Sequence, residues 1–359
     1  DKINSLTNST NTQTWNNWAE ARIDINQIFS IGYNLPKGYH MVPVLQPNED
    51  DEGPVLQNDS AYIANGADGS GIRIAIFDGG FNGLSTRITN GVAPNAVYYW
   101  DNSATILISI DTVSTSPHGT ACVETVFDHA PGATYEIYRR NSTTDYGNAV
   151  TQAITNGVDI ISNSQSNYNL GWADNSGAVC TAVQNASNNG ILWFASAGNR
   201  AESHWEGSFS DSDGDNWHNF SGNDERNDFT IPSNDGNGWN SYLSWNDAGT
   251  GSTADYDFYL YDVGTSPITL LASSTASSGF ESIFFNNTSG SAITACFSVK
   301  SSSGTTPTFE FFRHASQAFE YQTASGSNSS PSNSTAANVI SVGALPLTSY
   351  NSSPGTGGI

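Results

Sequence analysis

The chain has 359 residues, of which 37% are hydrophobic and 11% aromatic, so it is long enough and apolar enough to bury a sizeable core. Its 11 lysines and arginines face 34 aspartates and glutamates, which gives a formal net charge of −23. That sign argues against nucleic acid and against anionic membrane surfaces as partners, because both are bound through basic patches. No apolar run approaches the roughly 18 residues that a membrane-spanning helix needs.

The sequence also bears on the compartment of the protein. Its cysteines are an odd number, Cys122, Cys180 and Cys296, which excludes a full disulfide framework but leaves room for one disulfide pair. The first residues, DKIN, have neither an initiator Met nor the apolar region of a signal peptide, and they are typical of a processed terminus. Few lysines and cysteines and many Asn, Ser and Thr residues favour an exported protein. We therefore expect a secreted, extracellular location.

Residues 1–60 are predicted to form an N-terminal extension. From residue 61 to residue 200, short apolar stretches alternate with stretches whose apolar residues recur at helical spacing. The predicted strands are 72–77, 135–138, 158–161 and 191–195, and the predicted helices follow His118 and cover 149–154 and 178–186. Strands that alternate with crossover helices predict a parallel sheet covered on both faces.

Between residues 201 and 313 the pattern changes to short segments with a period of two, separated by turns rich in Gly, Ser and Asn. Many short strands at roughly ten-residue spacing predict an antiparallel, jelly-roll-like β-sandwich. Parallel-strand character returns within 314–359. The predicted fold class is therefore α/β, a three-layer parallel sheet with helices on both faces that is interrupted by a β-sandwich insertion.

Three polar residues stand where chemistry is expected. Asp78 ends a buried strand, His118 opens a helix, and Asn199 follows the end of a strand of small residues. An aspartate can fix the tautomer of a histidine, and an asparagine amide can donate to a developing oxyanion. Each residue alone also fits a plainer interpretation, respectively a strand-ending turn, a polar helix start and an ordinary turn.

Together, the segments around these residues resemble the subtilases, the subtilisin-like serine peptidases. The similar segments are IRIAIFDGG (72–80), PHGT (117–120), DHAPGA (128–133), VDIISNS (158–164), FASAGN (194–199) and ANVISVGA (337–344). The resemblance covers about residues 60–200 and 330–350. It implies a subtilisin-like sheet and a serine endopeptidase that hydrolyses peptide bonds through an acyl-enzyme.

The resemblance also implies residue roles. Asp78 would orient the imidazole, His118 would act as general base and acid, and Asn199 would stabilise the oxyanion. An extended protein or peptide substrate would bind along the segments after two strands, namely Ser164, Gln165, Ser166, Ala197 and Gly198. The chemistry requires no cofactor.

The sequence departs from the subtilase pattern at its end. The family's nucleophilic serine lies in a Gly-Thr-Ser segment after the returning strand, and these 359 residues contain no such segment in that context. Ser349 to Gly355 resembles the stretch that precedes the serine segment in the family, so we expect these residues to end before the serine motif. We expect the serine outside this chain, on a C-terminal fragment that completes the fold. The alternative is a catalytically incomplete, subtilase-like binding or scaffold protein.

One acidic segment in the insertion is a candidate metal site. Asp211, Asp213 and Asp215 alternate around Gly214, and carboxylate oxygens are the ligands that Ca²⁺ prefers. A structural calcium ion is therefore one expectation. A solvated acidic turn is the other, because the segment lacks the matching Glu and helices of an EF-hand.

Overall fold

The computed structural model describes residues 13–15, 18–20, 59–101, 104–105, 111, 115–140, 143–167, 177–233, 238–246, 254–275, 280–304, 308–313, 317–323 and 338–344. The chain divides into two compact units, 1–56 and 57–359. Within the first unit, the short strands β1 (Gln13–Trp15) and β2 (Trp18–Glu20) pair in antiparallel fashion. Everything described below belongs to the second unit.

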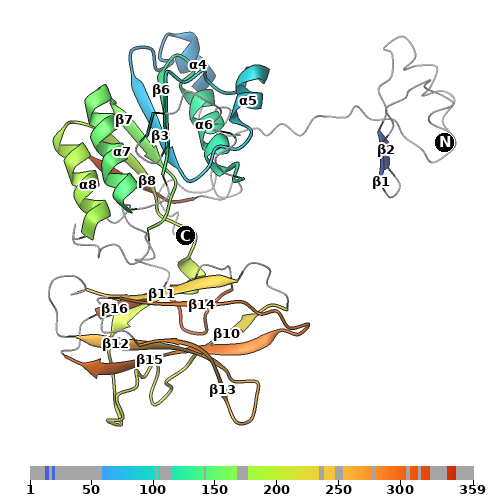
Figure 1. Ribbon diagram of the computed structural model, residues 1–359, viewed down its shortest axis with the longest axis vertical. Coiled ribbons are helices and arrows are strands. Elements are labelled where there is room, and N and C mark those ends of the chain that lie inside the picture. The colour runs from blue at the N-terminus through green and yellow to red at the C-terminus, as the bar shows by residue number, and fades with distance from the viewer. Residues whose placement is uncertain are drawn as a thin grey trace. The chain divides into compact units, whose positions relative to one another are not determined.

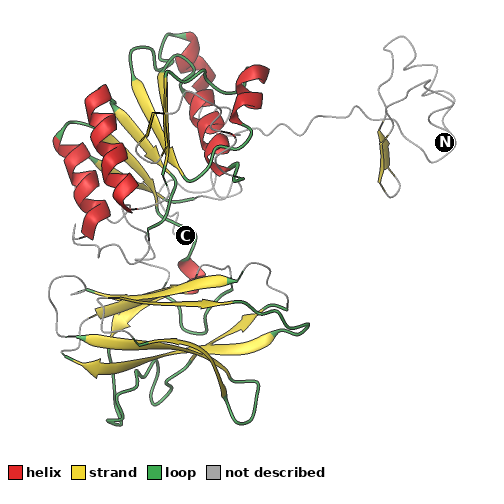
Figure 2. Ribbon diagram, in the orientation of Figure 1, coloured by secondary structure: helices red, strands yellow, loops and turns green. Residues whose placement is uncertain are grey.

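A sheet of seven strands forms the first half of the second unit. Figures 1 and 2 show this sheet packed among helices. Its order is β17 (Val339–Val342), β8 (Leu192–Ser196), β7 (Ile160–Asn163), β3 (Arg73–Asp78), β6 (Thr134–Arg139), β4 (Tyr98–Asp101) and β5 (Ala104–Thr105). All neighbouring strands are parallel except β4 and β5. The sheet is therefore of the parallel type that the alternation of strands and helices predicts.

Helices cover both faces of this sheet (Figure 1). They are α5 (Leu84–Asn90), α6 (His118–His129), α7 (Thr143–Asn156) and α8 (Gly177–Asn188), and the short helix α4 (Asp59–Ala64), which buries no residue, precedes β3 in the chain. Because side chains alternate along a strand, Ala75 and Phe77 of β3 pack with α7 and α8, whereas Ile74 and Ile76 pack with α5 and α6. A strand buried on both faces explains the unbroken apolar run that precedes Asp78.

The carboxyl ends of the central strands lie at one edge of the sheet. Phe77 is in register with Asn163 of β7, and Asn163 is in register with Ala195 of β8. The residues that follow these strands therefore emerge side by side, and such an edge is where open α/β sheets bind ligands. Asp78, Ser164 and Ala197 all leave their strands here.

Two antiparallel sheets, each of four strands, form the second half, and Figure 2 shows them stacked face to face. One has the order β10 (Asn227–Ile231), β15 (Ile293–Ser303), β12 (Asp255–Asp262) and β13 (Thr269–Ser274). The other has the order β14 (Phe280–Phe285), β11 (Trp239–Trp245), β16 (Thr308–Arg313) and β9 (His204–Ser208), which follows the short 3-10 helix η3 (Ala201–Ser203). Their facing side chains form one aromatic-rich core that includes Phe258, Phe297 and Phe311.

The predicted fold class is confirmed: a parallel sheet with helices on both faces is interrupted by an antiparallel β-sandwich. The sandwich strands lie between β8 and β17, and β17 pairs with β8 in parallel. The predicted domain boundaries remain predictions, and Ser349 to Gly355 lies outside the described residues. Among the described helices, none is long and apolar enough to cross a membrane.

Candidate active site

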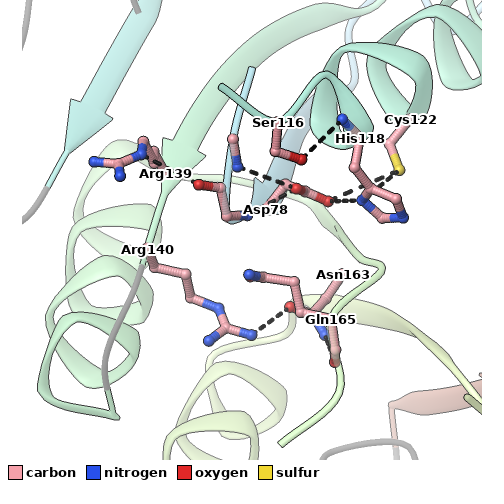
Figure 3. Close-up of polar contacts among 10 residues, drawn as sticks. Asp78, Ser116, His118, Cys122, Arg139, Arg140, Asn163 and Gln165 are labelled. Atoms are coloured by element: carbon pink, nitrogen blue, oxygen red, sulfur yellow. Dashed lines mark hydrogen bonds and ion pairs between the residues drawn. The ribbon is translucent and has the colours of Figure 1, made fainter. Parts of the chain in front are cut away.

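Asp78 and His118 meet at the carboxyl edge of the sheet (Figure 3). The Asp78 carboxylate is buried, with the residue 2% exposed, and its Oδ2 lies 2.7 Å from His118 Nδ1. Its other oxygen, Oδ1, accepts hydrogen bonds from the backbone N–H groups of Gly79 at 2.7 Å and Gly80 at 3.3 Å. These bonds fix the carboxylate, so that it can hold one imidazole tautomer and leave His118 Nε2 free to exchange a proton with a reactant.

Close packing of helix α6 against the end of β3 makes this contact possible. The backbone N–H of Gly119 donates to the carbonyl oxygen of Gly80 at 2.8 Å. A Cβ on Gly119 would lie 2.6 Å from Asp78 Cβ, from Gly80 O and from a ring carbon of Phe81. Only a glycine at this position lets the helix start so near the strand end, so the residue after His118 sets the distance between His118 and Asp78.

Cys122 is a third member of this cluster that the sequence analysis did not single out. Its Sγ lies 3.9 Å from Asp78 Oδ2 and 4.0 Å from His118 Nδ1, and the thiol is free. The spacing of four residues within one helix places the Cys122 side chain beside His118, and that spacing was the available signal. The hydrogen bond to Asp78, followed by that to Cys122, raises the pKa of His118 from 6.5 to about 10.

The segment expected to bind the substrate backbone continues from β7. Ser164 and Gln165 are half-buried and Ser166 is exposed. The Gln165 amide lies over the Asp78 turn, since a Cβ on Gly79 would be 3.0 Å from Gln165 Nε2. This segment therefore lies beside the Asp78–His118 pair (Figure 3).

A buried arginine contacts both ends of the same segment. Arg140 is 4% exposed, and its Nη2 donates to Asn163 Oδ1 at 3.2 Å while its Nη1 lies 3.4 Å from Asn167 Oδ1. Its guanidinium carbon stands 3.8 Å from the centre of the Tyr146 ring. Burial lowers the pKa of Arg140 to about 10, so the group stays charged at neutral pH. The cation fixes both ends of the 163–167 segment.

The last predicted site residues follow β8. Ala197 donates its backbone N–H to the carbonyl oxygen of Val342 at 2.8 Å, and Gly198 has a φ of 99°, which a residue with a side chain rarely adopts. Asn199 is exposed. It follows β8 by three residues, and β8 is two strands away from β3 in the order β8-β7-β3. Its role as an oxyanion donor remains a prediction.

No protein-family model and no curated protein sequence matches the chain. Among solved structures, the CspB protease of Clostridium perfringens is similar at 12% identity and a TM-score of 0.49, over 84% of this chain and 75% of that one. A lanthipeptide protease is similar at 23% identity and a TM-score of 0.33, over 41% of this chain and 45% of that one. At such values the site itself has to carry any functional argument.

The raised pKa of His118 gives a pH dependence of stability with a definite sign. The folded protein binds the His118 proton more tightly than the unfolded chain, so the stabilisation is fully present below pH 6.5 and is lost as the pH rises to about 10. Urea unfolding at several pH values should show the wild type losing its advantage over a His118→Gln variant across this range. Because the His118 side chain is 55% exposed, the difference should be small, and an advantage that grows with pH would contradict the assignment.

The acidic segment of the insertion brings its carboxylates together. One oxygen from each of Asp211, Asp213 and Asp215 lies within 4.8 Å of the others. Asp211 also accepts backbone N–H bonds from Gly214 at 2.7 Å and Asn216 at 2.9 Å. Burial and the neighbouring aspartates raise the pKa of Glu225, which adds a fourth carboxylate to this surface. The oxygen set suits Ca²⁺, and calcium binding remains a prediction.

Calcium should stabilise the sandwich if this prediction is correct. With the millimolar affinities of extracellular calcium sites, about 10 mM Ca²⁺ should raise the unfolding temperature by roughly 2–8 °C. The same concentration of Mg²⁺ should not, because that smaller ion demands a tighter octahedral cage. Calorimetry on the wild type and an Asp213→Asn variant tests this. If both ions shifted the unfolding temperature equally, or if the variant kept the calcium shift, the segment would be a solvated acidic turn and not a calcium site.

Proposed function

We propose that this chain belongs to a secreted serine endopeptidase of the subtilase type, with its nucleophilic serine outside these 359 residues. The observation that carries the proposal is the 2.7 Å contact between His118 Nδ1 and a buried aspartate that two backbone N–H groups orient. Imidazoles held in this way act as general bases towards a hydroxyl. The substrate is a protein or a peptide bound in extended form along the segment beginning at Ser164.

The residues of this chain would act in two half-reactions. His118 Nε2 takes the proton of the serine hydroxyl as its oxygen attacks the scissile carbonyl carbon, and Asp78 stabilises the imidazolium that forms. The Asn199 amide donates to the resulting oxyanion. His118 then protonates the departing amine, which leaves an acyl-enzyme. In the second half-reaction His118 activates a water molecule, and the acyl group is released as an acid.

Ile340 and Val342 of β17 support the expectation of a completing segment. They are 42% and 49% exposed, although they lie on a strand of the parallel sheet. Strands of such a sheet are normally covered on both faces. A C-terminal fragment that carried the serine would also bring apolar cover for these two side chains.

A fluorophosphonate probe tests the proposal directly, because it reacts with serines that a histidine activates. The natural protein, expressed from its own gene, should be labelled. A His118→Ala variant of it should not be labelled. His129→Ala is a matched control, because His129 lies on the same helix and pairs with Asp59 away from the site. Labelling of the control should persist. A folded wild type that is not labelled would favour the non-catalytic scaffold.

A further inference from the structure

A second cluster of titratable side chains lies on the sandwich, on adjacent strands. Glu206 of β9 is directly opposite Glu310 of β16, and His204 is opposite Phe312. Trp205 and Phe311, which alternate with these residues, pack in the sandwich core. His204, Glu206 and Glu310 therefore share the other face of the sheet.

The orientation of His204 is fixed by its surroundings. The residue is fully buried, and its ring stacks on Phe312 with the ring centres 4.4 Å apart. His204 Nδ1 lies 2.6 Å from the backbone carbonyl oxygen of Thr323, which can only accept, so Nδ1 carries the proton. In the neutral ring, Nε2 then presents a lone pair.

That lone pair meets oxygen atoms that are themselves acceptors. His204 Nε2 is 3.4 Å from Glu310 Oε2, and it has no hydrogen-bond partner among the described residues. Ser244 donates to the other oxygen of Glu310 at 3.3 Å. The arrangement places a nitrogen lone pair against a carboxylate that is 8% exposed, which is repulsive unless a positive charge lies between them.

The second glutamate increases this repulsion. Like charges directly opposite each other on neighbouring strands destabilise a sheet, and Glu206 faces Glu310 in that way. One nitrogen of His204 and one oxygen of each glutamate lie within 4.8 Å of one another. A proton on His204 would balance only one of the two carboxylates.

We propose that His204 Nε2, Glu206 and Glu310 bind a divalent transition-metal ion of the zinc class. Imidazole nitrogen and carboxylate oxygen together suit such ions, whereas Ca²⁺ and Mg²⁺ prefer oxygen alone. A histidine whose Nδ1–H donates to a backbone carbonyl has the tautomer that a metal at Nε2 requires. The ion would link β9 to β16. Because His204 also bonds the Thr323 carbonyl oxygen through Nδ1, it would connect the segment around Thr323 to the same site. The proposal does not depend on the peptidase assignment.

Zinc binding to the 359-residue chain tests this site. The measurement is made on a Cys122→Ser variant, which lacks the thiol beside His118. Excess Ca²⁺ is added to saturate the acidic segment Asp211 to Asp215. Calorimetric titration with Zn²⁺ should give one site per chain. Glu310→Gln and Glu206→Gln should each weaken it by more than about tenfold. Glu202→Gln removes the same charge from an exposed position near His204 and should leave the affinity unchanged.

Two further readouts keep the test decisive. Circular dichroism shows whether each variant is folded. If Glu310→Gln does not fold, the zinc affinity of Glu206→Gln decides, because the Glu206 side chain is half-exposed and its change is less disruptive. Nitrogen-15 spectra of the zinc-loaded protein should show His204 with a proton on Nδ1 only. Protons on both ring nitrogens at neutral pH would identify a buried ion pair and overturn the proposal. So would zinc affinity that neither glutamine variant reduces.

Discussion

If the protein acts as proposed, an Asp78→Asn variant of the natural protein should lose about four orders of magnitude in kcat towards a peptide substrate. The amide can present its NH₂ group to His118 Nδ1, which selects the wrong imidazole tautomer and removes the charge that stabilises the imidazolium. The buried position of Asp78 and its two backbone donors, Gly79 and Gly80, leave the side chain little room to compensate.

A second readout on the 359-residue chain separates this effect from unfolding. Because the bond to Asp78 is the largest cause of the raised His118 pKa, the Asp78→Asn variant should titrate closer to 6.5 than the wild type. NMR of the imidazole protons measures this directly. In the wild type, activity should also rise with pH towards about 10, since only neutral His118 acts as a base. An unchanged His118 titration in the variant would mean that the two side chains are not paired in solution.

The sequence predicted the parallel sheet for physical reasons that are local, whereas the pairing of Asp78 with His118 followed only from the resemblance of their segments to the subtilases. The apolar run before Asp78 requires burial on both faces, and neighbouring parallel strands bring their carboxyl ends to one edge. The period-two segments likewise predicted the sandwich, because each strand needs a core on one face only. These patterns depend on the chain near each residue, and they can be read without coordinates.

Contacts across elements could not be predicted in this way. The Arg140 contact with Asn163 joins the end of β6 to the end of β7 across the intervening strand β3, and a buried arginine leaves no periodic signal in the sequence. His204 and Glu310 are more than a hundred residues apart, and only the register of β9 against β16 brings them together. Register is set by turn geometry and cross-strand packing, which a single sequence does not reveal.

A Gly119→Ala variant should be the most damaging single-methyl substitution near the site. The added Cβ would lie 2.6 Å from two backbone-anchored atoms, Asp78 Cβ and Gly80 O, so helix α6 must move rather than a flexible side chain. Overpacking of this kind typically costs about 1–3 kcal/mol. A displacement of about 1 Å between His118 and Asp78 should also lower activity by about a hundredfold. Denaturant unfolding and peptide hydrolysis measure the two effects.

Gly147→Ala is the matched control, because Gly147 lies within helix α7 and a Cβ there would have no heavy atom within 4 Å. Alanine is favoured over glycine inside helices by about 0.5–1 kcal/mol, so this variant should be more stable than the wild type, with activity intact. The same Gly→Ala change would then lower the free energy of unfolding at position 119 and raise it at position 147. If Gly119→Ala were also neutral or stabilising, helix α6 could not be held against β3 as closely as the Gly119–Gly80 hydrogen bond requires, and the spacing of His118 and Asp78 would need another cause.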